Sequence, residues 1–243
     1  LERARHIAAQ SGLPLAAMTF FPHPRQVIGA SDAPFGYITP PGEKMKRMRE
    51  CGVEHLYWVK FDRSFASLSA EEYVRQYVVE NRVQHIVAGF DFKYGRRGEG
   101  DMHRLRALGE GRFGVTVVPE LNKRGEKISS TRIRDWISGG ELVLVPEYLG
   151  RYYETTGHVR AAGASLLAVD VSEPYILPPA GRYEIDLHGG PAGACCMPNV
   201  SAELTERREL AVRADDADFR QWRGRPVRMV WKRRLPGERS GSD

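Results

Sequence analysis

The chain has 243 residues, 42% hydrophobic and 28% charged, an ordinary composition for a soluble globular protein that excludes an intrinsically disordered one. Its 36 Lys and Arg against 31 Asp and Glu give a net charge of +5, which suits phosphate ligands but is too small and dispersed to indicate a nucleic-acid surface. No apolar run approaches the roughly 18–20 residues of a membrane span. The three cysteines lack the spacing of a zinc site or of a disulfide framework. A cytoplasmic protein with reduced thiols is therefore predicted.

The first part of the chain alternates between short apolar runs and helical patterns. The runs have the length and the β-branched or aromatic content of strands, at 13–20, 54–59, 83–88 and 114–118. Helices are expected at 1–10, 43–50, 70–81 and 102–110. Strands that are apolar on both faces and alternate with helices predict an α/β fold with a parallel sheet, in which ligands bind beyond the carboxyl ends of the strands.

The pattern changes near Pro146. Beyond it, many glycines and prolines separate short alternating runs, which predict strands at 155–159, 165–171, 183–187 and 227–231. We therefore expect an α/β domain over 1–148, a small antiparallel β domain over 149–236 and a disordered tail over 237–243.

Ser and Thr residues open a predicted helix in the segment KISSTRIR (127–134), and a glycine pair at 139–140 ends it. A helix N-terminus offers backbone N–H groups and a partial positive charge to an anion. Hydroxyls add donors, and an arginine adds a fork that matches two phosphate oxygens. The segment indicates a phosphate site, with an ordinary capped helix and solvent-facing arginines as the alternative.

The segment GFDFKYG (89–95) directly follows the third predicted strand. Its two glycines permit close approach of a ligand to the backbone. Phe92 and Tyr94 are suited to flank a flat ring, and Asp91 is suited to bind the polar edge of that ring. The alternative is a tight surface turn with aromatic anchors.

The segment TFFPHP (19–24) holds His23 between two prolines at a strand end, where ligands bind in this class of fold. A single histidine is more often structural, so the pattern alone leaves both interpretations open. Asp62, after the second strand, is more typical of a helix cap than of a ligand contact. The other six histidines show no metal-ligand spacing.

In this order, TFFPHP, GEK (42–44), KFDRSFASLSAEEYV (60–74), GFDFKYG and ISSTRIR resemble the flavin adenylyltransferase half of bacterial bifunctional riboflavin kinase/FAD synthetases. The resemblance covers about residues 1–160, and GRYY (150–153) resembles the start of that family's kinase domain. It implies a Rossmann-like nucleotidyltransferase domain followed by a small antiparallel β-barrel. It also implies an FAD synthetase reaction, in which the phosphate of FMN attacks the α-phosphorus of ATP, with Mg²⁺, to give FAD and pyrophosphate.

The motif match also implies roles for individual residues. The ATP phosphates would be held by His23, Lys127, Ser129, Ser130, Thr131 and Arg134. Catalytic charge stabilisation would come from Ser130, Thr131 and Arg134. The flavin pocket would include Gly89, Asp91, Phe92, Tyr94 and Gly95. No protein metal ligand is assigned, and the expected partners are small molecules only.

Two features of that family are missing from the chain. The HxGH signature of the first strand–helix turn is absent, so the chain is expected to lack roughly 20–25 N-terminal residues with the first strand, and to be poorly active as it stands. The kinase domain's GFPTAN-type segment is replaced by RAAGASLLAVDVSEPYILPPAGRYEI (160–185), and Glu209 is a loose match for the family's catalytic carboxylate. A kinase-like barrel with lost or impaired riboflavin kinase activity is therefore expected.

Three other interpretations stay open. The first is a bifunctional enzyme with a divergent kinase, which riboflavin turnover would identify. The second is a flavin- or nucleotide-binding regulator without catalysis. The third is an adenylyltransferase with another phosphorylated acceptor, against which GFDFKYG argues.

Overall fold

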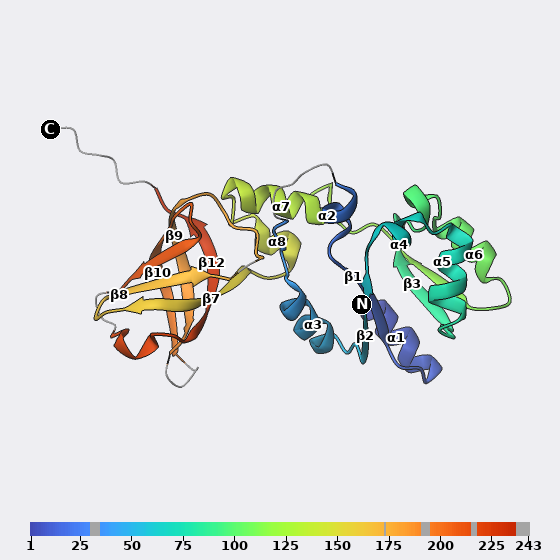
Figure 1. Cartoon of the computed structure of the whole chain (residues 1–243), viewed down its shortest axis with the longest axis horizontal. Helices are drawn as coiled ribbons and strands as arrows, with labels where there is room; N and C mark the ends of the chain where they lie inside the picture. The colour runs from blue at the N-terminus through green and yellow to red at the C-terminus, as the bar shows by residue number, and fades with distance from the viewer. Residues whose placement is uncertain (30–34, 173, 191–194, 215–217, 237–243) are drawn as a thin grey trace. The chain divides into compact units, whose positions relative to one another are not determined.

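The computed structural model describes residues 1–29, 35–172, 174–190, 195–214 and 218–236, and Figure 1 traces the elements. The chain forms two compact units. The first contains Leu1–Phe35 and Thr39–Leu121, and the second contains Gly36–Ile38 and Asn122–Asp243. Each unit is described by itself. The tail at 237–243 lies outside the described residues, and the domain boundary at 148/149 stays a prediction.

The first unit carries parallel strands and helices, as predicted. β1 pairs in parallel with β2, with Thr19 opposite Trp58, and β3 pairs in parallel with β4. The four strands form two separate pairs. The elements are α1 (Glu2–Ser11), β1 (Ala16–Phe21), α2 (Pro24–Ile28), α3 (Pro41–Glu50), β2 (His55–Lys60), α4 (Arg63–Ser67), α5 (Ala70–Val74), a π-helical turn (Arg75–Val79), β3 (His85–Gly89), a 3-10 turn (Arg96–Gly98), α6 (Met102–Gly109) and β4 (Gly114–Val118).

The core of the first unit lies between α5, α6 and the β3–β4 pair. Tyr73 and Val74 of α5 are buried together with Met102 and Leu105 of α6. Ser69 begins α5 through a capping box, because its hydroxyl accepts from the Glu72 backbone N–H at 3.2 Å while the Glu72 carboxylate accepts from the Ser69 N–H at 2.8 Å. The reciprocal cap and the buried face explain why this predicted helix forms.

The strands of the β1–β2 pair are less buried than the sequence pattern predicts. Met18, Tyr57 and Trp58 are all exposed. Parallel sheets are normally covered on both faces. Here each strand has a single strand partner among the described residues, and these apolar side chains are partly uncovered.

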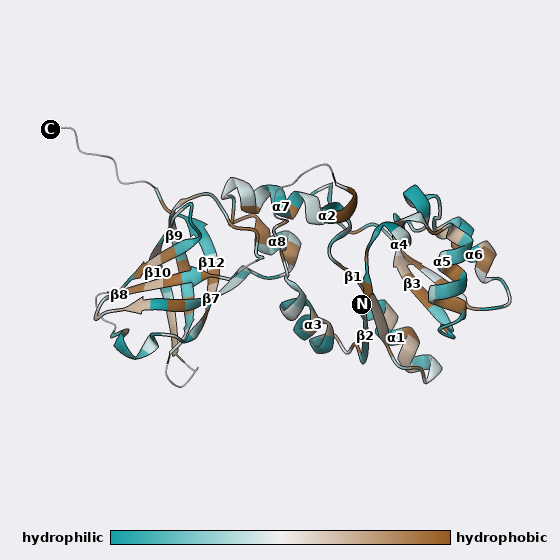
Figure 2. Cartoon of the chain, viewed as in Figure 1, coloured by the Kyte–Doolittle hydropathy of each residue, from teal (hydrophilic) through white to brown (hydrophobic). Residues whose placement is uncertain are grey.

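The second unit contains a closed antiparallel barrel with the strand order β10-β11-β8-β7-β12-β9. Along β7, buried side chains alternate with more exposed ones, and Figure 2 shows hydrophilic and hydrophobic residues mixed along the barrel strands. Tyr153, Tyr183 and Trp231 are fully buried inside, and the Trp231 indole N–H donates to the buried Thr155 hydroxyl at 2.9 Å. The strands are β7 (Tyr153–Ala162), β8 (Leu166–Val171), β9 (Gly181–Gly189), β10 (Cys195–Leu204), β11 (Glu209–Arg213) and β12 (Pro226–Arg234).

Two helices pack on the barrel core within the same unit. They are α7 (Ser130–Gly139) and α8 (Val145–Leu149), preceded by a short hairpin of β5 (Asn122–Lys123) and β6 (Glu126–Lys127). Ile137 and Val145, both 0% exposed, belong to the hydrophobic cluster that fills the barrel. This packing fixes the axis of α7 and presents its N-terminus to solvent.

Candidate functional site

The N-terminus of α7 matches the predicted phosphate-binding segment. Ser129 is the N-cap, and its hydroxyl accepts a hydrogen bond from the Arg132 backbone N–H at 3.2 Å. Ser130 and Thr131 are exposed in the first turn, and Lys127 is exposed on β6 just before it. The turn therefore combines two accessible hydroxyls, helical N–H groups and a nearby ammonium, which is a chemistry suited to phosphate.

The two arginines of this helix face different partners. Arg132 forms an ion pair with Glu126 at 3.1 Å and lies over the Trp136 ring, 5.2 Å from its centroid. Arg134 is half-buried, and its guanidinium donates to the backbone carbonyl of Gly36. An arginine has five N–H donors, so Arg134 can hold the Gly36 carbonyl and a phosphate oxygen together.

The segment Gly36–Ile38 is itself anchored on the barrel unit, a contact that the sequence pattern does not predict. The Tyr37 N–H donates to the Pro174 carbonyl at 2.7 Å, and the Ile176 N–H donates to the Tyr37 carbonyl at 3.0 Å. The buried Tyr153 hydroxyl donates to the Ile176 carbonyl at 2.5 Å. The acceptor of Arg134 is thereby held by backbone contacts rather than by a mobile side chain.

The predicted flavin segment forms a turn after β3 in the first unit. The Phe92 N–H donates to the Gly89 carbonyl at 3.0 Å, and the Asp91 side chain is exposed. The Phe92 ring stacks on Tyr94, with centroids 5.7 Å apart and planes 20° apart. At the carboxyl end of β3, Asp91 is therefore accessible and Phe92 is partly accessible.

Tyr94 and Gly95 lie deeper than their neighbours in this segment. Tyr94 is 5% exposed, packs against Tyr73 at 5.1 Å between ring centroids, and has its pKa raised to about 12 by burial. Gly95 has a φ of 73°, and a Cβ there would lie 2.9 Å from the Ala70 backbone nitrogen. Tyr94 and Gly95 pack this turn against α5, and Tyr94 also supports the Phe92 ring.

His23 is the N-cap of α2, four residues after Thr19 of β1. Its Nδ1 accepts from the Arg25 backbone N–H at 3.2 Å, and its ring stacks on Phe35 with centroids 4.2 Å apart. A neutral histidine whose Nδ1 accepts a hydrogen bond carries its ring proton on Nε2, and such a proton suits donation to a phosphate oxygen. Asp62 caps α4 by accepting from the Phe65 N–H at 2.9 Å, which confirms its structural interpretation and lowers its pKa.

The predicted residues divide between the two units. The first unit holds His23 and the flavin segment, and the second holds Lys127, Ser129, Ser130, Thr131 and Arg134. Across the described ranges, no group of three or more His, Cys, Asp or Glu side chains is arranged to hold a metal ion. Within the same ranges, none of the helices has the length and apolarity needed to cross a membrane.

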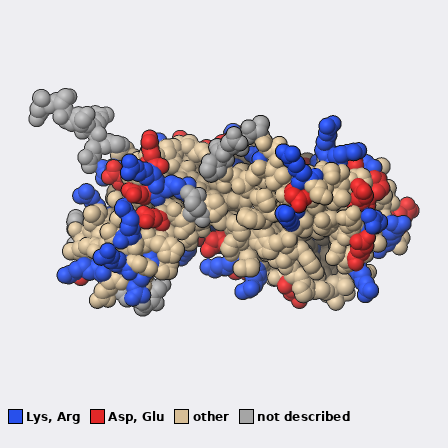
Figure 3. Space-filling model, in the orientation of Figure 1, with Lys and Arg blue, Asp and Glu red and all other residues tan. Residues whose placement is uncertain are grey.

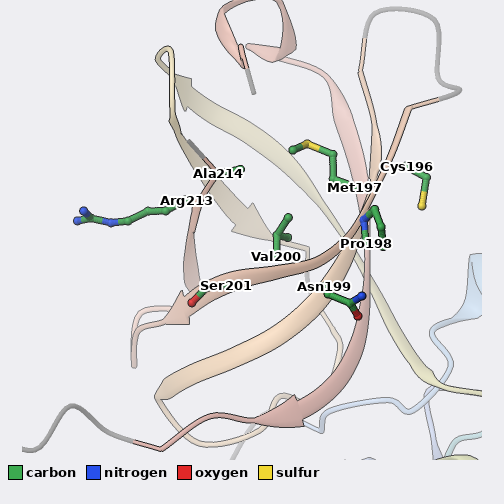
Figure 4. Close-up of a pocket in the computed structure, with 8 residues that line it drawn as sticks. All are labelled: Cys196, Met197, Pro198, Asn199, Val200, Ser201, Arg213 and Ala214. Carbon is green, nitrogen blue, oxygen red and sulfur yellow. The ribbon is translucent and has the colours of Figure 1, made fainter. Parts of the chain in front are cut away.

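Two other features of the surface are its charge distribution and a pocket that no predicted site residue lines. Figure 3 shows basic and acidic side chains interspersed on one face of the molecule. An open pocket of about 430 Å³ lies where β10 extends beyond its pairing with β11. Met197, Asn199 and Val200 line it, and Arg213 points away from it in Figure 4.

Comparisons with known proteins cover both units. A family model described as FAD synthetase matches residues 1–132. The bifunctional riboflavin kinase/FMN adenylyltransferase of Bacillus subtilis is 35% identical over an alignment of 248 positions, which covers 97% of this chain and 78% of the relative. An FAD synthetase of Listeria monocytogenes is 32% identical over 173 residues, which span 71% of this chain and 68% of the relative.

A solved structure from Streptococcus pneumoniae, described as a macrolide-efflux protein, resembles this chain with a TM-score of 0.88 and 25% sequence identity. The alignment covers 99% of this chain and 81% of the other. The fold likeness therefore extends over both the parallel α/β unit and the barrel unit.

Proposed function

The chain belongs to the FAD synthetase family, and from that premise we propose that it transfers AMP from ATP to FMN, with FAD and pyrophosphate as products. A phosphate oxygen of FMN forms a bond to the α-phosphorus of ATP, and the bond between the α-phosphorus and the bridging oxygen breaks. Pyrophosphate leaves with that oxygen. The reaction needs no covalent enzyme intermediate, so alignment of the phosphates and stabilisation of their charge supply the catalysis.

The observation that carries this proposal is the first turn of α7. Ser130 and Thr131 are exposed there, and Arg134 is fixed one turn later by the Gly36 carbonyl. Hydroxyl, backbone N–H and guanidinium donors that are already oriented stabilise developing negative charge without reorganisation. Lys127 and Ser129 add positive charge and a capped start to the same turn.

The residues of the first unit have their own roles in the proposal. His23 donates to the triphosphate through Nε2, and its cap on α2 fixes the ring. Asp91 binds a polar edge of the flavin, and Phe92 contacts the flavin ring system, supported from below by Tyr94. Gly89 and Gly95 shape the backbone of this turn.

Mg²⁺ is proposed to arrive with ATP. Magnesium commonly binds substrate phosphates together with one or two carboxylates and several waters, so it does not need a dedicated protein cage. Its chemistry is charge neutralisation on the phosphates, and the proposed cellular location, where ATP and FMN are available, is the cytoplasm.

We further propose that the barrel does not phosphorylate riboflavin. Glu209, the match for the family's catalytic carboxylate, forms an ion pair with Arg160 at 3.2 Å, and Arg160 also contacts Asp170 at 3.3 Å. The proposal rests on this ion pair and on the replacement of the GFPTAN-type segment by 160–185. The alternative is that the barrel is a divergent but active riboflavin kinase, because relatives of this chain are named as bifunctional enzymes.

One experiment tests both proposals. The protein expressed from its complete natural reading frame is incubated with Mg–ATP and either FMN or riboflavin, and the flavins are separated. FAD from FMN, with no FMN from riboflavin, is the expected result. FMN formed from riboflavin would overturn the proposal that the barrel is not a kinase. A folded protein that makes neither product would favour a flavin- or nucleotide-binding regulator without catalysis.

A further inference from the structure

Lys44 of the Gly42-Glu43-Lys44 motif has an unusual position that no role above explains. It lies in the first turns of α3, and its side chain is half-buried. The ammonium donates to the Thr19 hydroxyl at 3.1 Å, and Thr19 of β1 is 8% exposed. The head of a surface lysine normally extends into water. The ammonium of Lys44 is instead directed toward the buried Thr19 hydroxyl.

No acidic group balances this charge in the ranges that the structure describes. Lys60, by comparison, pairs with the Asp62 carboxylate at 3.6 Å, whereas Lys44 contacts a neutral hydroxyl. Burial lowers the pKa of Lys44, since desolvation disfavours the ammonium. A partly buried cation without a counter-charge costs stability and is a favourable place for an anion to bind.

The contact with Thr19 puts this ammonium near the carboxyl end of β1. α3 lies between the parallel strands β1 and β2 in the chain, and its Lys44 reaches β1 two residues before the last residue of that strand. Thr19 is near that end of β1, and the same strand leads directly to His23. Ligands of parallel α/β sheets bind at this edge.

We propose that Lys44 binds a phosphoryl oxygen of a nucleotide substrate, and that Thr19 orients its ammonium when the substrate is absent. The proposal rests on the adenylyltransferase function argued above. The phosphoryl group belongs to the ATP triphosphate or to FMN, and the two sources present the same chemistry to an ammonium.

Separate binding measurements distinguish the two sources without requiring turnover. ATP binding is measured by calorimetry in the absence of FMN, and FMN binding is measured by fluorescence quenching in the absence of ATP. Lys44→Met keeps the apolar stem and removes the charge, and it is expected to weaken binding of one of the two by about 10- to 100-fold, as for loss of a charged hydrogen bond. Lys44→Arg should retain most of that affinity.

Two further variants define the controls. Lys46→Met removes an equal charge from an exposed position of the same helix and should leave both affinities unchanged. Thr19→Val removes the resting partner of Lys44. If Lys44 only fastens α3 to β1, then Thr19→Val and Lys44→Met will lower the Tm equally and leave both affinities unaltered, which would overturn the proposal.

A measurement on the unmodified protein covers the case in which Lys44→Met does not fold. Acetylation of Lys44 by acetic anhydride, followed by mass spectrometry, should be slowed at least about 5-fold by saturating ATP or FMN, as expected for a bound amine. Equal acetylation with and without both nucleotides would refute the inference. Failure of the proposed function is a different result, namely nucleotide binding by the wild-type protein without FAD formation.

Discussion

Replacing Gly36 with alanine tests whether the Gly36–Ile38 segment holds Arg134 in place. A Cβ at this position would lie 2.7 Å from Ile176 Cα and 2.9 Å from both Ile176 Cβ and Ile176 N. Two of these atoms are backbone and none is the far end of a flexible side chain, so the segment must move away. The shift breaks the Tyr37–Pro174 and Ile176–Tyr37 hydrogen bonds and withdraws the acceptor of Arg134.

The expected cost follows from those three bonds. Two backbone hydrogen bonds at about 1 kcal/mol each and one charged hydrogen bond at about 1.5–3 kcal/mol give roughly 3.5–5 kcal/mol if all are lost. For a protein of this size, that lowers the Tm by roughly 7–20 °C. Because Arg134 also loses its orientation, the KM for ATP should rise about 10-fold, while FMN binding stays unchanged.

The assay combines thermal unfolding with FAD formation over a range of ATP concentrations. Gly139→Ala is the matched control, since a Cβ at this last residue of α7 meets only Glu141 Cγ at 4.0 Å. The control should unfold at or slightly above the wild-type temperature. A Gly36→Ala protein with the wild-type Tm and the wild-type KM for ATP would refute the reasoning.

Three further predictions test other parts of the molecule. Asp91→Ala should weaken FMN binding about 10-fold and ATP binding little, by titration of each ligand alone, and the reverse order would contradict its flavin assignment. Thr155→Val should lower the Tm by roughly 2–10 °C, because the buried Trp231 N–H loses its acceptor, whereas Thr155→Ser should retain the wild-type Tm. Burial lowers the pKa of His188 below its usual 6.5, so the fold favours the neutral ring, and stability should fall as the pH drops below about 6.5. In His188→Gln the difference in Tm between pH 7.5 and pH 5.5 should shrink, and an unchanged difference would argue against this assignment.

The elements that the sequence predicts best are those with one unbroken pattern. The helix at 102–110 and the strand at 114–118 are confirmed nearly to the residue. β10 escapes prediction because its register shifts between Met197 and Val200, and Asn199 adopts a φ of 55° there, so the alternation breaks. α8 escapes because Pro146 suggests a boundary, whereas it occupies the first turn of a helix.

The candidate site also has a part that the sequence predicts and a part that it does not predict. Local chemistry identifies the first turn of α7, since caps, hydroxyls and arginines are all within a few residues. The partner of Arg134 is 98 positions away in the chain, and the partner of Lys44 is 25 positions away. Such contacts depend on tertiary packing, which hydrophobic periodicity does not encode.

The two kinds of sheet imply unequal protection of their backbone amides. Every strand of the closed barrel has two neighbours, so its amides exchange with solvent only through larger openings. Each strand of the β1–β2 and β3–β4 pairs has one described strand neighbour, which leaves alternate amides outside the ladder. The first unit should therefore exchange and unfold at lower denaturant than the barrel. A nucleotide whose contacts lie mainly in the first unit would raise the earlier of the two transitions and leave the later one where it was.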